Sequence, residues 1–332
     1  MTSNRLSGTA AATDHAIGPS GGVTVRFVDW DIELRAVQGD RVRVTDSGGG
    51  ALPDDLDIET TSTGIALRQQ AGIGLGVPTD RIRRDARLVV EVPEGAEVDI
   101  QTASSDVIAT GLRGGQRFRT ASGDLYLSEA AGQVNAEAVS GDVAIRATGS
   151  VELALKTVSG DVAISGGRLE RLAVATTSGD VMLASEFGAG PHSISTLSGD
   201  ALVEADRGIR ITARTVAGDL SSELPHASEG GPGRRALVIG DGAISLQFRS
   251  VSGDLRVVGP GRLSFEFPPP PRQAATYASI APATLDAAPT PDAAPDAADG
   301  TRLDILRALE RGDMDIAEAS ERLSSLDGPT DD

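Results

Sequence analysis

A Ser-Gly-Asp phrase followed by an aliphatic residue recurs along the middle of the chain and limits what the chain can fold into. The aspartates of its eight copies are Asp106, Asp124, Asp142, Asp161, Asp180, Asp200, Asp219 and Asp254. Successive copies lie 18, 18, 19, 19, 20, 19 and 35 residues apart. Such regular spacing is typical of a repeat architecture, in which each repeat is one supersecondary unit stacked on its neighbours.

Aliphatic residues stand at fixed places around each aspartate. One follows the aspartate directly, as Val162 does after Asp161, and others stand eight and six places before it, as Leu153 and Leu155 do. A spacing of two is the strand pattern, whereas a helix buries residues at a period of 3.6. The glycine beside a serine and an aspartate in nearly every repeat also disfavours a helix. Each repeat is therefore predicted to hold two short strands.

A repeat of about 19 residues without a helical crossover can bury both strands by stacking each coil in register on the next. The predicted fold class is all-β, a single-domain parallel β-helix or β-solenoid, right-handed by the general rule for parallel crossovers. Equivalent side chains would then lie about 4.8 Å apart along the stack. The recurring glycine is expected at a corner with positive φ. Ser105 replaces it in the first copy, so that corner is expected to differ.

The boundaries of the chain's parts follow from changes in composition. We expect a disordered tail at 1–22, the β-solenoid at 23–267, a linker rich in Pro, Ala and Asp at 268–300, a helical hairpin at 301–327 and a disordered end at 328–332. Four consecutive prolines at 268–271 end the solenoid, because proline cannot donate to another strand ladder. Phe265 and Phe267 are predicted to plug its open end.

The first coils are predicted to be irregular, as the capping end of a repeat stack should be. The pattern begins with Val23, Val25 and Phe27 before Asp31, and strands are expected at 41–45, 57–61, 64–68 and 87–92. The glycine-rich segment 72–76 is interpreted as a flexible loop, because it lacks the Gly-Lys-Ser/Thr that completes a phosphate loop. The 35-residue gap before Asp254 is interpreted as one repeat with a surface loop at 222–235.

The C-terminal segment is predicted to form two short amphipathic helices that bind a protein partner or a second copy of the chain. Their apolar positions, the candidate interaction residues, are Leu303, Leu306, Leu309, Ile316, Leu323 and Leu326, with Ala319 beside them. Gly312 ends the first helix, and Asp315 with Glu318 forms a capping box for the second. A hairpin of about 26 residues buries too little surface to be stable alone, so it needs a partner or its own solenoid.

Composition restricts the partners. The formal charge of −18 argues against nucleic acid and anionic membrane surfaces. The chain has no cysteine, which excludes disulfides and thiol chemistry. No segment approaches 18 consecutive apolar residues, so direct membrane insertion is not expected. Residues 1–22 lack the apolar core of a secretory signal, and the predicted location is therefore the cytoplasm.

The aspartates are the one chemical constellation in the sequence. Ionised neighbours about 5 Å apart repel by roughly 0.8 kcal/mol in water and roughly 3 kcal/mol at an effective dielectric of 20. Hydrogen bonds from turn N–H groups or from the serine two places before each aspartate would offset this repulsion, and a row of Ca²⁺ ions is the alternative. The 19-residue phrase differs from the nine-residue calcium repeat, so we predict a structural aspartate ladder with no metal and no cofactor.

No catalytic residues are predicted. His15, His192 and His226 are isolated, and His192 occupies the column that holds Leu153 and Leu172 in other coils, which indicates a wall residue. Aromatic residues make up 3% of the chain, few for a sugar-binding groove. Phe118 and Phe248 stand in the apolar column six places before the aspartate. The chain is predicted not to be an enzyme, with a carbohydrate-active β-helix enzyme kept as one alternative.

The repeated Ser-Gly-Asp-Val with alternating valines resembles a bacterial family of β-strand-repeat, adhesin-like proteins of unknown function. The resemblance covers roughly residues 22 to 267 and implies a β-solenoid that works at or near the cell envelope under stress. The C-terminal segment resembles the short helical oligomerisation-type domains attached to many bacterial envelope-stress proteins. Together these features predict a non-enzymatic scaffold with a C-terminal interaction module; a self-assembling, end-to-end β-helix polymer is the second alternative.

Overall fold

The structure, a computed structural model, describes residues 4–7, 12–70, 87–206, 208–231 and 234–263. These residues form 23 strands and no helix, as expected for an all-β chain. No helix in this part of the chain is long and apolar enough to cross a membrane. The predicted loop at 72–76, the phenylalanine plug, the linker and the C-terminal hairpin lie outside the described residues.

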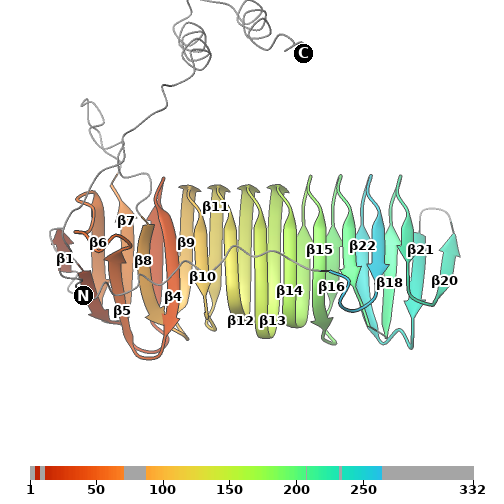
Figure 1. The fold of residues 1–332 in the computed structure, drawn as a ribbon, viewed down its shortest axis with the longest axis horizontal. Helices are drawn as coiled ribbons and strands as arrows, with labels where there is room; N and C mark the ends of the chain where they lie inside the picture. Colours follow the sequence, from red (N-terminus) through yellow and green to blue (C-terminus); the bar gives the residue numbers. More distant parts are fainter. Residues whose placement is uncertain (1–3, 8–11, 71–86, 207, 232–233, 264–332) are drawn as a thin grey trace, which may run out of the picture. The chain divides into compact units, whose positions relative to one another are not determined.

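The central strands stack as two parallel sheets that face each other across one core (Figure 1). They are β9 (Glu97–Ser104), β10 (Val107–Thr110), β11 (Gln116–Ser122), β12 (Leu125–Ser140), β13 (Val143–Ser159), β14 (Val162–Ala175), β15 (Val181–Phe187), β16 (His192–Ser195) and β17 (Ala201–Glu204). The residue after each aspartate pairs with its equivalent in the next coil, as Val143 pairs with Leu125 and Val162. The predicted parallel β-solenoid is therefore confirmed for these coils.

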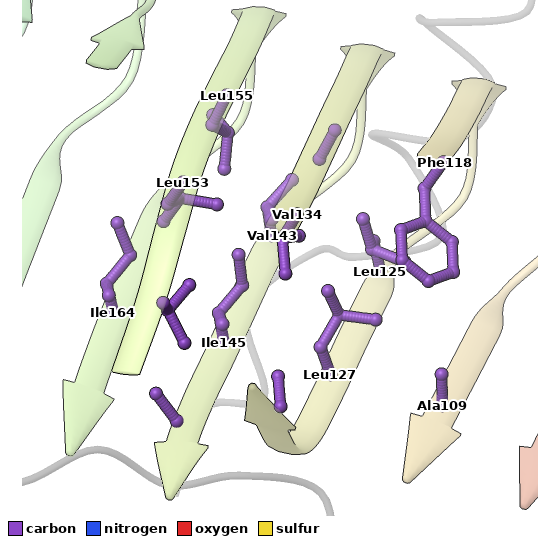
Figure 2. Packing of buried hydrophobic residues seen from close by; sticks show 14 of the residues in the cluster. Ala109, Phe118, Leu125, Leu127, Val134, Val143, Ile145, Leu153, Leu155 and Ile164 are labelled. Atoms are coloured by element: carbon purple, nitrogen blue, oxygen red, sulfur yellow. The ribbon is translucent and has the colours of Figure 1, made fainter. Parts of the chain in front are cut away.

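Alternation with a period of two fills the core. In β13 the buried residues alternate with half-buried or exposed ones, and in β12 and β14 the buried Leu127 and Ile164 flank Ile145 in register. Figure 2 shows these side chains packed between the two sheets. Large and small residues complement each other along the stack, since Phe118 lies next to Ala136. Each fully buried aliphatic side chain contributes about 1.5–3 kcal/mol of transfer free energy.

The N-terminal end is made of β1 (Asn4–Ser7), β2 (Ala12–Ala16), β3 (Gly22–Phe27), β4 (Asp31–Val37), β5 (Arg41–Asp46), β6 (Leu56–Thr61), β7 (Gly64–Gln69) and β8 (Arg87–Pro93). Its coil order departs from the chain order, because β3 lies between β7 and β9, and β4 lies between β8 and β10. Beyond the inserted coil of β3 and β4, β6 pairs antiparallel with β7, and β5 pairs antiparallel with β8. The outermost strands, β1 and β2, pair antiparallel with β6 and β5, respectively.

Two expectations change at this end. The strands predicted at 41–45, 57–61, 64–68 and 87–92 are present, but β5 and β6 pair antiparallel with both of their neighbours rather than parallel. Residues 4–7 and 12–16, placed in a disordered tail by the sequence, form β1 and β2 instead. The tail is short of apolar residues, but backbone pairing to β6 and β5 needs none, which is why the composition did not reveal these strands.

The C-terminal end repeats the same construction. Its strands are β18 (Ile209–Arg214), β19 (Leu220–Ser222), β20 (His226–Gly231), β21 (Arg234–Ile239), β22 (Ile244–Arg249) and β23 (Leu255–Val258). Although β22 and β23 come last, β22 lies between β16 and β18 (Figure 1). In the same way, β23 lies between β17 and β19. The segment 222–235, predicted to be a surface loop, mostly forms the antiparallel hairpin of β20 and β21 that pairs with β18.

Candidate functional site: an aspartate ladder and an apolar ridge

Nine successive coils carry an aspartate at one corner, and eight of the nine carboxylates bond to the next coil. The structure brings all eight predicted aspartates into one column and adds Asp31 at its start. The order along the stack is Asp31, Asp106, Asp124, Asp142, Asp161, Asp180, Asp200, Asp254 and Asp219. In each step the backbone N–H of one aspartate donates to Oδ1 of the preceding one over 2.7–3.0 Å. We call this column the aspartate ladder.

The donors are backbone N–H groups of the corner, one of the two kinds of donor that the sequence indicated, and not the serine two places before the aspartate. Each N–H belongs to the aspartate of the neighbouring coil, as Asp161 N–H bonds to Asp142. A hydrogen bond to a charged acceptor contributes about 1.5–3 kcal/mol, comparable with the repulsion between neighbouring carboxylates. The ladder therefore joins coils and offsets part of its own repulsion.

The glycine before the aspartate makes this contact possible. Gly160 has φ +123°, and a Cβ added to it would lie 2.1 Å from the carbonyl oxygen of Gly141. The backbones of adjacent corners thus touch where any other residue would hold them apart. The positive φ expected at the corner glycines is present at Gly123, Gly141, Gly160, Gly179 and Gly199 but not at Gly218 or Gly253. Ser105 has no positive φ either, and its corner still carries the ladder bond of Asp106.

The last carboxylate of the ladder is capped by a cation. Asp219 has no further coil to bond, and its Oδ1 accepts a hydrogen bond from Arg235 Nη1 at 2.9 Å. Elsewhere Tyr126 donates its hydroxyl to Asp124 Oδ2 at 3.0 Å. Burial, the hydrogen bond to Asp124 and the charges of nearby ladder aspartates raise the pKa of Tyr126 to about 12. The phenol accordingly stays a donor throughout the physiological range.

We predict that the aspartate ladder holds the coils together without a metal ion. Within the described residues no group of three or more His, Asp or Glu side chains is arranged to hold a metal. Thermal unfolding of the full chain should therefore have the same midpoint in Ca²⁺ and in a chelator, because a ligand of the native state alone would raise it. A midpoint higher by many degrees in Ca²⁺ would show that the carboxylates bind the ion.

A line of mostly apolar and mostly exposed side chains runs along the same corner, three residues before each aspartate; Thr177 is polar and Ala103 is half-buried. In stack order it consists of Val28, Ala103, Ala121, Val139, Val158, Thr177, Leu197, Val251 and Val216. We call this line the apolar ridge. All six large hydrophobic residues that are exposed in the described part of the chain belong to it, and they are 47% to 84% exposed. Scattered apolar residues are common on protein surfaces, but six large ones aligned in one column, interrupted only by Ala103, Ala121 and Thr177, are not a scattered set.

Backbone hydrogen bonds keep the rungs of the ridge adjacent. The N–H of Ser178 donates to the carbonyl of Val158 at 2.9 Å, and Ser198 and Ser252 donate likewise to Thr177 and Leu197. Nine rungs about 4.8 Å apart give a ridge roughly 40 Å long. Because the ridge belongs to a hydrogen-bonded sheet, its side chains keep their spacing without a partner.

A second polar column lies on the other side of the ridge, two residues earlier in each coil. In stack order it consists of Arg26, Gln101, Arg119, Glu137, Lys156, Ala175, Ser195, Arg249 and Arg214. Its five cations are all exposed, and only Glu137, which pairs with Arg119 at 3.3 Å, opposes them. We call it the basic column. Across this face the charge changes from basic through apolar to acidic.

The histidines show no shared site. His15 and His226 bond to backbone carbonyls of Thr61 and Leu224, and His192 lies in the wall column between Leu172 and Leu246, as the sequence indicated. His192 is 2% exposed; its Nε2 lies 2.9 Å from the Gly188 carbonyl and its Nδ1 has no partner. Burial lowers the pKa of His192, although the Gly188 carbonyl and the charge of Glu170 oppose the shift.

His192→Leu is expected to make the fold less sensitive to acid. The folded-state pKa of His192 lies below the unfolded value, so the stabilisation from its neutral form is present above about pH 6.5 and is lost as the pH falls through the folded pKa. Leucine fits between Leu172 and Leu246 and cannot take up a proton. The difference in melting temperature between pH 8 and pH 5 should therefore be smaller for the variant, and an equal difference in both proteins would contradict the assignment.

A cleft of about 510 Å³ lies among the ends of β15 and β17 and the starts of β18 and β22, and it bears on the enzyme alternative. Glu186, Glu204, Asp206 and Phe187 are among its lining residues. Both carboxylate oxygens of Glu204 accept backbone N–H groups, from Gly261 and from residue 263. Phe187 is buried and packs edge-on against His192 with 5.1 Å between ring centroids, so it presents no open aromatic face to a sugar.

The ridge and the basic column were not found by the sequence reasoning. Both are visible once the copies are aligned on the aspartate, at three and five places before it. The prediction followed the inward columns instead, because hydrophobic residues are expected inside. The signal that could have revealed the ridge is an apolar residue at a place whose strand alternation points it outward.

The fold and its corner define a β-solenoid protein built from Ser-Gly-Asp repeats. The chain belongs to the Toastrack DUF4097 family, whose model matches residues 23–258. This agrees with the adhesin-like, function-unknown family that the repeats resembled. No protein with a curated description matches the chain.

Solved structures are similar over most of the chain. One, from Bacteroides fragilis, is described as a "putative adhesin"; it is 11% identical with a TM-score of 0.40, and the match covers 77% of this chain and 97% of the other. Another, from Clostridium sporogenes, is described as a "putative cell adhesion protein"; it is 8% identical with a TM-score of 0.26 and covers 75% of this chain and 98% of the other. Likeness at this level adds nothing about partners.

Proposed function

We propose that this protein is a non-enzymatic interaction scaffold, a rigid β-solenoid that binds another protein along its apolar ridge. The observation that carries the proposal is the ridge itself, since every large exposed hydrophobic residue of the described chain lies on it. An apolar line between two charged columns resembles the anatomy of protein interfaces, in which a desolvated centre is surrounded by polar groups.

The stacked coils hold the ridge residues rigidly in place before any partner binds. Binding is costly when it must immobilise loops and side chains, and the ridge residues stand on strands or at corners that are already hydrogen-bonded to both neighbours. Valine and threonine also have few rotamers to lose. We expect most of the binding free energy to come from Val139, Val158 and Leu197 near the middle of the ridge, where water is most easily excluded.

The expected C-terminal hairpin and the cytoplasmic location remain predictions within this proposal, as does a role in envelope stress. The end-to-end polymer is less well supported by the fold, because both ends of the described stack are covered by antiparallel strands, β1 with β6 and β20 with β21. Parallel coils of a second molecule could not continue these strands in the same register.

Photo-crosslinking from the ridge tests the proposal. A photoreactive amino acid placed at Val158 should form adducts with protein in the cells that make this chain. The same group at Thr148, an exposed residue of the same strand, should form few. Adding Val139→Asp next to the probe should remove the Val158 adducts. Equal adduct formation from Val158 and Thr148 would show that the ridge is not an interaction surface.

A further inference from the structure

We propose that the protein which occupies the apolar ridge is a second copy of this chain, bound in parallel around a two-fold axis that runs along the ridge. This inference rests on the proposed function, since it names the partner of the same surface. The occupant is identified by two properties of the face, its charge pattern and its area.

The charge pattern is self-complementary in one orientation. Crossing the face, the basic column comes first, then the ridge, then the aspartate ladder. A two-fold axis parallel to the ridge reverses this order in the second copy, so each basic column faces the other copy's ladder and the ridges meet in the middle. A two-fold axis across the ridge would instead bring the two ladders together, and facing carboxylates repel.

The cations are placed to meet several aspartates in this orientation. Five of the nine basic-column positions carry Arg or Lys, and they occur at both ends and in the middle of the stack: Arg26, Arg119, Lys156, Arg249 and Arg214. Every ladder carboxylate except that of Asp219 uses Oδ1 for a backbone N–H of the next coil. Its second oxygen can then accept from a facing cation, except at Asp124, where Tyr126 already donates to that oxygen.

The available area is that of a stable dimer. The ridge with its two flanking columns spans roughly 40 Å along the stack and roughly 20 Å across, or about 800 Å² per copy, which is the size of a standard protein interface. The net charge of −18 makes the copies repel at long range. Salt at about 0.15 M screens charges beyond roughly 8 Å and leaves the close contacts, so association is to be measured there.

Sedimentation velocity of the full chain tests the dimer. We expect a dimer at micromolar concentration, weakened at least about 100-fold by Val139→Asp with Val158→Asp, because each buries a charge at the centre of the contact. Thr148→Asp adds the same charge away from the ridge and should leave the dimer unchanged. Circular dichroism verifies that the variants keep their strands.

One further variant separates the ridge from the C-terminal segment. The triple change Leu306→Asp, Leu309→Asp, Leu323→Asp should leave the ridge dimer intact; a dimer lost in this variant and kept in the ridge variant would assign association to the C-terminal segment and overturn the proposal. A chain that stays monomeric at high concentration would also overturn it. In that case, ridge adducts with a different protein would leave the proposed function standing.

The parallel orientation has its own test, because the chain contains no cysteine. With the axis along the ridge, each residue faces its own equivalent, so Val139→Cys, Val158→Cys and Leu197→Cys should each form a disulfide-linked dimer under mild oxidation. Thr148→Cys should not. Crosslinking at one ridge position alone would indicate a crossed or antiparallel contact and refute the parallel pairing.

Discussion

Gly160→Ala is expected to lower the free energy of unfolding by about 3 kcal/mol or more, a large part of the 5–15 kcal/mol typical of a folded domain. Two costs combine in this variant. The backbone at φ +123° disfavours a residue with a Cβ, and the new methyl group would lie 2.1 Å from the carbonyl oxygen of Gly141. Conformational strain of this kind and forced overpacking each cost about 1–3 kcal/mol.

Other glycines of the chain separate the two costs. Gly253 has the close contact, 2.2 Å to the Gly199 carbonyl oxygen, without a positive φ, and Gly39 has φ +139° with nothing within 4 Å of an added Cβ. Gly22 has neither. Chemical denaturation of the four alanine variants should therefore rank the losses with Gly160 largest, Gly253 and Gly39 smaller, and Gly22 smallest. A Gly160→Ala variant as stable as Gly22→Ala would mean that the corners are not in contact.

Gly160→Ala is also expected to weaken the aspartate ladder at this corner. If the methyl group pushes the two corners apart, the N–H of Asp161 moves away from Asp142 Oδ1, and the bond of 2.9 Å is lost with it. Hydrogen exchange at Asp161 should therefore accelerate more than exchange at residues in the middle of β13. The glycine precedes the aspartate because it lets the backbones of adjacent corners come close enough for the N–H of one aspartate to reach the carboxylate of the other.

The register of the repeats could be predicted from the sequence, because the alternation around the motif determines which residues face the core and which face the solvent. A slip of one residue in β13 would bring Val143 and Ile145 out of the core and expose them to water, so few alternatives compete. The same alternation predicts that His192 lies in the wall of the solenoid, between Leu172 and Leu246, where the structure has it. The columns specify which residues stack on one another. They carry no information on the order in which the coils are stacked.

The order of the coils at the two ends could not be predicted for that reason. Asp219 follows Asp200 by a normal repeat, so the sequence favours direct stacking, yet Asp254 bonds to Asp200 and lies between them. At the N-terminal end the sequence did contain a signal for antiparallel pairing. Only two residues separate Thr61 from Gly64, a connection that is typical of a hairpin and too short for a parallel crossover.

The apolar ridge was missed because the sequence reasoning assigned binding to the C-terminal segment and followed only the inward-facing columns. Val139 and Val158 follow buried Ala138 and Thr157 directly, so their strand positions point outward. A valine at such a place stabilises the strand through its β-branched side chain even when it is exposed. Only the stacked coils show that these residues form one line.

Truncation after Ala243 is expected to destroy the C-terminal end of the solenoid, although it removes only the last two described strands. These strands are internal, because β22 separates β16 from β18 and β23 separates β17 from β19. Phe248 is 1% exposed and lies between Ile194 and Ala213 in its column. Direct stacking of Ala213 on Ile194 would leave that volume empty, and losing a buried phenylalanine costs about 3–5 kcal/mol.

Truncation after Pro271 is the matched comparison, since it removes the predicted linker and hairpin and keeps β22 and β23. Its strand signal and melting temperature should stay close to those of the full chain. The shorter chain should instead lose hydrogen-exchange protection from 209 to 239, where β18 and its hairpin partners would have no parallel neighbour. Full protection of β18 after the Ala243 truncation would mean that β18 has moved onto β16. In that case the last coil is inserted because equivalent coils compete for the same place, and not because the packing around Phe248 is complementary.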